Sequence, residues 1–173
     1  MTTYYRVDRV NAYTEGDIIE LTNPSGIPNE FIQVMDMLSP GGFSPHGLMY
    51  LSNSSAHAAD KSVAIDFSLE LFRRAFFDSK PSRYQSIFAW GRLEDAQSFK
   101  SKLLPDFPNC IIYEVSTSSE NIHRGDMSIL SNDKTNLVYA DILRLYWSGS
   151  TFTNKPLWEY LLPLPVKIGR MVS

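Results

Sequence analysis

Residues 81–104, with the sequence PSRYQSIFAWGRLEDAQSFKSKLL, constrain the fold of this chain more than any other segment. The run 86–90 is short, apolar and rich in β-branched and aromatic residues, and it lies between a proline and a glycine, which is typical of a buried strand. After the glycine, apolar residues recur every three or four positions, and Glu94 and Asp95 come early, where a helix start favours acids. The segment therefore predicts a buried strand that leads into an amphipathic helix.

The same periodicities assign the rest of the chain. Ile65, Leu69 and Phe72 share one helical face, which makes 62–76 the clearest helix. Further helices are expected at 30–38 and 139–147, and strands at 3–10, 18–21, 110–115, 157–162 and 166–172. The stretch 39–47 holds two prolines and three glycines, so it is expected to be an irregular loop around His46. The polar stretch 116–126 is expected to be exposed.

Length and charge limit the protein class. A chain of 173 residues that is 43% hydrophobic predicts one domain, residues 1–173. Sixteen basic against nineteen acidic residues give a net charge of −3, which argues against a protein that coats a phosphate backbone. No apolar run reaches eighteen residues and the N-terminus lacks a signal-peptide core. We therefore expect a cytoplasmic protein with no membrane partner, and delivery into another cell by a dedicated machine stays open.

Several common site types are missing from the sequence. His46, His57, His123 and the single Cys110 do not have the spacing of metal ligands, so no metal is predicted. Cys110 lies in an apolar strand pattern and is expected to be core. Neither a phosphate-binding glycine loop nor a nucleophile elbow is present.

Glu159 is the strongest candidate for chemistry. It lies between Trp158 and Tyr160 in the C-terminal stretch LWEYLLPLPVKIGRMV. A carboxylate among aromatic residues is either exposed on one strand face or buried at a cost, and the second case alters its pKa and its role.

Three features in chain order resemble the ADP-ribosyltransferase superfamily. They are Arg6 on the N-terminal strand, the Ser-Ile-Phe-Ala strand at 86–89 with its helix, and Glu159 before Leu-Leu-Pro. The resemblance implies an α+β fold with a split, mainly antiparallel sheet flanked by helices, and NAD as the substrate in the cleft. It also implies transfer of ADP-ribose to a macromolecular acceptor, with protein favoured over nucleic acid, or NAD hydrolysis, as in a bacterial effector or toxin.

The resemblance also implies roles for individual residues. Glu159 would stabilise the positive charge that develops when the nicotinamide–ribose bond breaks, and Arg6 and Ser86 would complete the catalytic set. The residues expected to bind NAD are Arg6, His46, Arg83, Ser86, Phe88 and Trp90. Leu157 stands where arginine-modifying toxins have Glu or Gln, so arginine is disfavoured as the acceptor.

Most of the chain also resembles a bacterial family of unknown function, DUF2441. The motifs that carry this resemblance are Ser-x-His-Gly at 44–47, Arg-Arg at 73–74, Pro-Ser-Arg-x-x-Ser-x-Phe-Ala at 81–89, Tyr-Trp-x-Gly at 146–149 and Trp-Glu-x-Leu-Leu at 158–162. Two other functions stay open. One is an inactive module of the immunity or inhibitor type that binds a nucleotide or a protein. The other is a nucleic-acid-binding domain that uses Arg73, Arg74 and Arg83, which would bind in a salt-dependent way.

Overall fold

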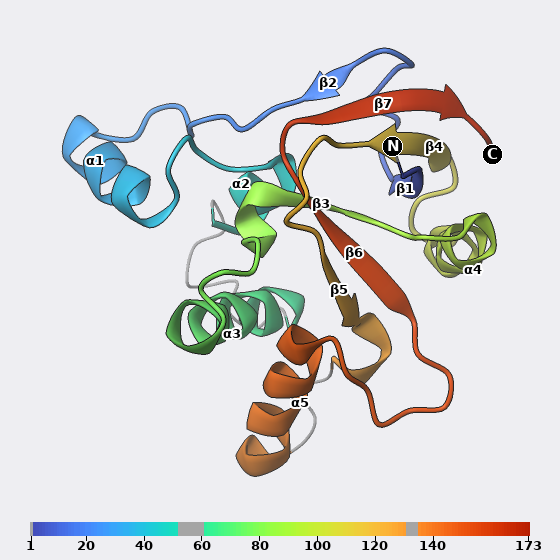
Figure 1. Cartoon of the computed structure of the whole chain (residues 1–173). Helices are drawn as coiled ribbons and strands as arrows, with labels where there is room; N and C mark the ends of the chain where they lie inside the picture. The colour runs from blue at the N-terminus through green and yellow to red at the C-terminus, as the bar shows by residue number, and fades with distance from the viewer. Residues whose placement is uncertain (1, 52–60, 131–134) are drawn as a thin grey trace.

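The computed structural model of the protein describes residues 2–51, 61–130 and 135–173 (Figure 1). The strands are β1 (Tyr4–Asp8), β2 (Ile18–Ile19), β3 (Ser86–Ala89), β4 (Ile111–Ser116), β5 (His123–Asp126), β6 (Trp158–Pro163) and β7 (Val166–Met171). The α-helices are α1 (Asn29–Leu38), α2 (Pro45–Leu51), α3 (Lys61–Phe76), α4 (Leu93–Leu103) and α5 (Asn136–Ser148). Two short 3₁₀ helices are η2 (Arg83–Gln85) and η3 (Met127–Ile129).

The strands form two antiparallel sheets, with the orders β1-β4-β7-β2 and β3-β6-β5. Helices flank both sheets (Figure 1). The α+β class and the mainly antiparallel pairing expected from the sequence are therefore confirmed. Among the described residues, no helix has both the length and the apolar character needed to cross a membrane.

The two sheets meet where β3 ends. Tyr5 N donates to Trp90 O at 2.9 Å and Trp90 N donates to Tyr5 O at 2.8 Å, so the residue after β3 pairs with β1 of the other sheet. Along β3, Ile87 and Ala89 face a core that both sheets share, with Leu162 from β6. Successive side chains of a strand point to opposite faces, which leaves Phe88 on the other face.

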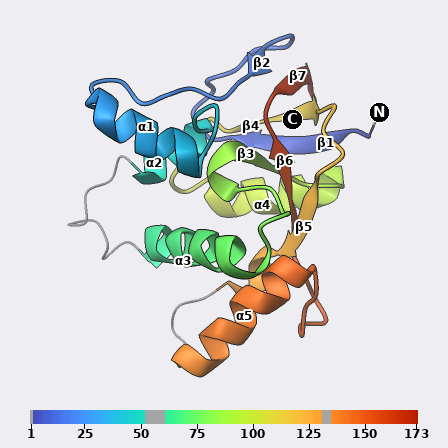
Figure 2. The same cartoon turned by 60° about the vertical axis from the view of Figure 1, so that its left-hand side comes forward.

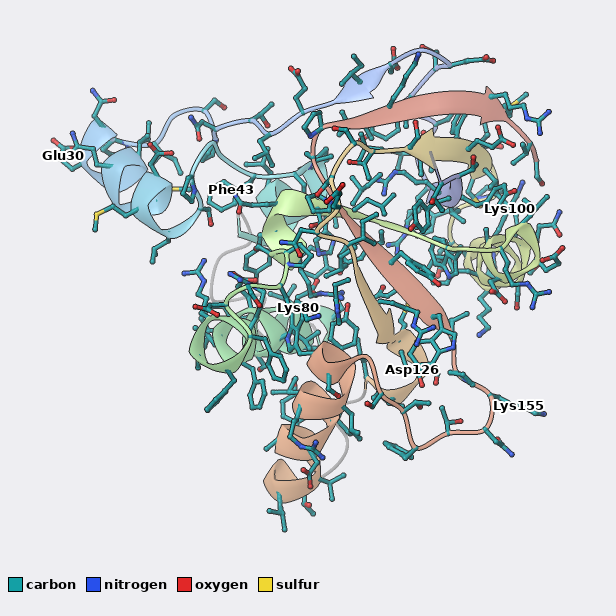
Figure 3. All side chains as sticks on the ribbon, in the orientation of Figure 1. Glu30, Phe43, Lys80, Lys100, Asp126 and Lys155 are labelled. Atoms are coloured by element: carbon teal, nitrogen blue, oxygen red, sulfur yellow. The ribbon has the colours of Figure 1, made fainter. Side chains whose placement is uncertain are left out.

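Helices cover each sheet on that other side. The helix α4 packs on β1 through Ala96 and Phe99, next to Trp90. The helices α3 and α5 pack on each other and lie against the three-stranded sheet, where Leu69, Trp147 and other apolar side chains meet. Figure 2 shows α3, α5 and β5 together at one end of the molecule. In Figure 3 side chains fill the space between these elements, and Asp126 marks the end of β5.

Two segments differ from the expectation. The predicted loop 39–47 is wrong at its end, because α2 begins at Pro45. Proline is accepted at the first helical position, and Ser44 Oγ caps the helix by accepting a hydrogen bond from Gly47 N at 3.1 Å. The polar stretch 116–126 is not wholly exposed, because its end forms β5. There His123 is buried by stacking on Trp147.

Candidate functional site

Two adjoining cavities lie on the face of the β3 segment that carries Phe88 and Trp90. Arg6 lines the first, which we call the arginine cavity, and its volume is about 240 Å³. Asp66 and Glu159 line the second, the carboxylate cavity, of about 410 Å³, a volume typical of small-molecule sites. Among the described residues, five side chains line both cavities: Arg9, His46, Phe88, Trp90 and Phe99.

Glu159 projects from β6 and is only 3% exposed. Its Oε1 accepts hydrogen bonds from Arg83 Nη1 at 2.5 Å and from the Tyr146 hydroxyl at 2.7 Å. Within the described part of the chain, its Oε2 accepts no hydrogen bond. One carboxylate oxygen is therefore held by the protein, and the other is available to a molecule in the carboxylate cavity.

Arg83 joins the two carboxylates of this cavity. Its Nε donates to Asp66, its Nη1 also donates to the Tyr146 hydroxyl, and its guanidinium lies 4.5 Å from the Phe88 ring centroid. Burial alone would lower the pKa of Arg83, but the carboxylates of Asp66 and Glu159 raise it well above its usual value. Because Arg83 stays charged, it supplies one positive charge to two acidic side chains, Asp66 and Glu159.

His46 is paired with Asp66 in the same cluster. His46 Nε2 lies 2.7 Å from Asp66 Oδ2, and the ring packs between Tyr50 and Phe88 at centroid distances of 4.2 and 4.4 Å. Gly47 lets α2 lie close to η2, because a Cβ at this position would lie 2.2 Å from the Tyr84 carbonyl oxygen. The Ser-x-His-Gly motif therefore caps α2 and lets it sit close to η2.

The arginine cavity offers hydrogen-bond donors without partners. Arg6 Nη1 donates to Phe88 O at 3.4 Å, and its guanidinium lies 5.7 Å from the Tyr13 ring centroid. Arg6 Nε and Trp90 Nε1 are both buried and have no hydrogen-bond partner among the described residues. An unpaired buried donor costs roughly 1–3 kcal/mol, so an acceptor atom of a ligand would stabilise this cavity.

Ser86 lies apart from these residues. Its hydroxyl donates to Ser82 O at 2.7 Å, and it lines a separate cavity of about 290 Å³ beside Arg73 and Lys80. The sequence-predicted residues that the structure brings to the two adjoining cavities are Arg6, His46, Arg83, Phe88, Trp90 and Glu159.

Sequence reasoning missed two members of the site, Asp66 and Tyr146. Asp66, Glu70 and Arg73 recur at i, i+4 and i+7 along α3, so this polar row next to the apolar face was a usable signal. Tyr146 belongs to the Tyr-Trp-x-Gly motif, but its hydroxyl reaches Glu159 only through the tertiary fold.

A second buried cluster lies on α3 outside both cavities. Glu70 is 2% exposed and accepts hydrogen bonds from Arg73, Arg74 and Ser82. Burial alone would raise the pKa of Glu70, but the two guanidinium groups, Arg73 first, lower it. Arg73 also donates to the carbonyls of Asp78 and Lys80. The guanidinium groups of Arg73 and Arg74 therefore donate mainly to acceptors within the protein.

The described part of the chain contains no group of three or more His, Cys, Asp or Glu side chains that could hold a metal ion. His57 lies outside the described residues.

Comparison with known proteins supports the family resemblance. A comparison with curated proteins finds no match. A family profile described as "Protein of unknown function (DUF2441)" matches residues 4–173. This match includes the segments that supply His46, Arg83, Tyr146 and Glu159. Because the match spans nearly the whole chain, the protein belongs to the DUF2441 family.

Proposed function

We propose that this protein is an ADP-ribosyltransferase-like enzyme that cleaves the nicotinamide–ribose bond of NAD and transfers ADP-ribose to a macromolecular acceptor. The observation that carries the proposal is the different polarity of the two adjoining cavities. The carboxylate cavity is lined by Glu159 and Asp66 with Arg9 and Arg83, and the arginine cavity by Arg6 and Arg9, with the Asp8 carboxylate bonded to backbone N–H groups. Arg6 Nε, and Nε1 of Trp90 on the boundary of the two cavities, are donors without a partner among the described residues. NAD has the matching polarity, with a cationic nicotinamide riboside next to an anionic pyrophosphate.

Each group has a role in this reaction. Glu159 Oε2 accepts from the ribose hydroxyls and stabilises the positive charge that forms on the sugar as nicotinamide leaves. Asp66, Arg83 and Glu159 are all buried, so charges in this site are screened less than in water and the effect is stronger. Arg6 and Trp90 donate to phosphate oxygens, and Phe88, which lines both cavities, borders the ring that leaves. Ser86 has no contact with NAD in this arrangement.

The split sheet supports the same proposal. The β3 segment pairs with β6 of one sheet and with β1 of the other, so it holds Glu159 and Arg6 on either side of one cleft. Because NAD is an intracellular metabolite, we propose that the activity is cytoplasmic, in the producing cell or in a cell that receives the protein as an effector or toxin.

The test is nicotinamide release from NAD by the purified protein, with and without cell extract as a source of acceptors. We expect Glu159→Gln to lower the release rate at least about 100-fold, the scale of losing one charge-stabilising contact in a transition state. Glu70→Gln is the matched control, because Glu70 is also buried and paired with arginine but lines neither cavity. Equal rates in Glu159→Gln and wild-type protein would refute the role of Glu159.

A second candidate is an inactive module that binds a nucleotide or a protein partner. The observation that favours it is the occupied Oε1 of Glu159, which Arg83 and Tyr146 hold as they would hold a structural carboxylate. Calorimetric titration with ADP-ribose separates the two. Binding of ADP-ribose without nicotinamide release under any condition would support this candidate and reject the enzyme.

A further inference from the structure

His46 is the one proton-accepting side chain at neutral pH among the five that line both cavities. The other four are an arginine, two phenylalanines and a tryptophan. A group at this position borders the carboxylate cavity, where we place the ribose, and also the arginine cavity, where we place the phosphates. A second substrate that approaches the sugar along this boundary would meet the imidazole.

The pairing with Asp66 determines which ring nitrogen is free. Burial would raise the pKa of Asp66, but Arg83 and His46 outweigh burial and lower it, so the carboxylate is ionised. An ionised carboxylate can only accept hydrogen bonds. His46 therefore carries its proton on Nε2 and directs it to Asp66 Oδ2. Its Nδ1 then holds a lone pair, and no group in the described residues donates to it.

The surroundings also keep the ring neutral. Burial lowers the pKa of His46, and Arg83 acts in the same direction, while Asp66 and Glu159 oppose the change only in part. Among the described residues, the charged groups that act most on the ring are Asp66 of α3, Arg83 of η2 and Glu159 of β6, and the cations Arg6 and Arg9 line cavities that His46 also lines. Tyr50 and Phe88 hold the plane of the ring. A neutral, oriented imidazole with a free lone pair is suited to general-base catalysis.

We infer that His46 is the general base for the acceptor substrate, that Asp66 is its positioning residue, and that the acceptor is a hydroxyl group. This inference rests on the proposed function. The acceptor oxygen forms a bond to ribose C1′ as the C1′–N bond breaks, and the bonding electron pair leaves with neutral nicotinamide. The hydroxyl proton passes to His46 Nδ1, and the imidazolium that results is paired with Asp66.

The charges near His46 explain the choice of a hydroxyl. A carboxylate acceptor needs no base, and the Asp66 and Glu159 carboxylates would repel it. A guanidinium acceptor would have to lose a proton before its nitrogen could attack, and a neutral imidazole is far too weak a base to remove a proton from a guanidinium. A hydroxyl is neutral and must lose its proton as the new bond forms. Water would give hydrolysis, and a hydroxyl of a macromolecule would give transfer.

The experiment measures kcat/KM against pH for wild-type protein, His46→Gln and Asp66→Asn. The products measured are free ADP-ribose, the methyl glycoside of ADP-ribose that forms in the presence of methanol, and labelled macromolecules in extract. We expect His46→Gln to lower the transfer rate about 10²–10⁴-fold, the usual contribution of a general base, and to abolish the acidic limb of the profile. Asp66→Asn should lose less activity and move the acidic limb to lower pH, because the carboxylate raises the pKa of His46.

Binding of ADP-ribose and circular dichroism show whether each variant is folded and still holds the donor substrate. If His46→Gln folds poorly, His46→Gly is used instead. Added imidazole should then restore part of its transfer rate. A variant with the wild-type rate and pH profile would overturn the role of His46 while the proposed function stands. If neutral hydroxylamine removes the ADP-ribose label from the macromolecules, the linkage is an acyl ester. That result would overturn the hydroxyl acceptor. Wild-type protein that releases no nicotinamide in any arm would overturn both proposals.

Discussion

Acidification should destabilise this protein through His123, a buried histidine behind the site. Its ring stacks on Trp147 at a centroid distance of 4.9 Å, and Nε2 lies 3.0 Å from the Tyr146 carbonyl oxygen, to which it donates. Burial first, and then the positive charge of Lys80, lower its pKa from 6.5 to about 4, although the bond to Tyr146 opposes this change. Arg83 and Arg124 add to the lowering.

The size of the effect follows from the two pKa values. In the unfolded chain His123 binds a proton near pH 6.5, whereas in the folded chain it stays neutral down to about pH 4. The stability that the neutral ring provides is therefore complete above pH 6.5 and is lost as pH falls toward 4. The full difference corresponds to about 3 kcal/mol, of which about 2 kcal/mol is lost between pH 7 and pH 5.

Urea unfolding followed by tryptophan fluorescence at pH 7 and pH 5 measures this loss. His123→Phe keeps an aromatic ring against Trp147 but cannot take up a proton, so its unfolding free energy should fall about 2 kcal/mol less than that of the wild type. His46 and the carboxylates titrate in both proteins and cancel in the comparison. Equal losses in the two proteins, or a directly measured pKa of His123 near 6.5 by NMR, would refute the reasoning.

Two further predictions concern the site. Arg83→Met leaves Asp66 and Glu159 buried without their shared cation, so the unfolding free energy should fall by about 3–5 kcal/mol at pH 7 and by less at pH 5, where the carboxylates can take up protons. An equal loss at both pH values, measured by urea unfolding against the wild type, would contradict this account. Gly47→Ala puts a methyl group 2.2 Å from a carbonyl oxygen of Tyr84, and we expect a loss of about 1–3 kcal/mol in the same assay. An unchanged unfolding midpoint would show that α2 can move away from η2 freely.

The fold was predictable where one periodicity dominates. The segment 86–90 was expected to be a buried strand and β3 is Ser86–Ala89, and the expected helix 62–76 agrees with α3, Lys61–Phe76. The first is a short apolar run between a proline and a glycine, and the second has apolar residues at helical spacing, and local sequence reports both patterns directly. The stretch that ends in β5 was not predictable in this way, because His123 is buried by partners from α5 that only the tertiary fold supplies.

The site was predictable residue by residue but not as a network. Glu159 stood out as a lone carboxylate among aromatics, and Arg83 as a charge in a turn before a buried strand. That Arg83 joins Glu159 to Asp66 depends on how η2 sits between α3 and β6, and no spacing along the chain reports this. For the same reason Ser86 could not be separated from Phe88 and Trp90 in advance, although its hydroxyl is bonded to Ser82.

The pairing of β3 with β6 affects how this protein is made in the cell. All of residues 90–157 leave the ribosome after β3 and before the strand that pairs with it. Until then, Ile87 and Phe88 belong to an apolar strand with open backbone groups, which is the kind of segment that associates with other nascent chains. Asp66 and Arg83 emerge before Glu159 as well, so the charge cluster closes only when β6 arrives. Chaperones that hold the nascent chain over this interval should therefore matter more for its yield than for its final stability.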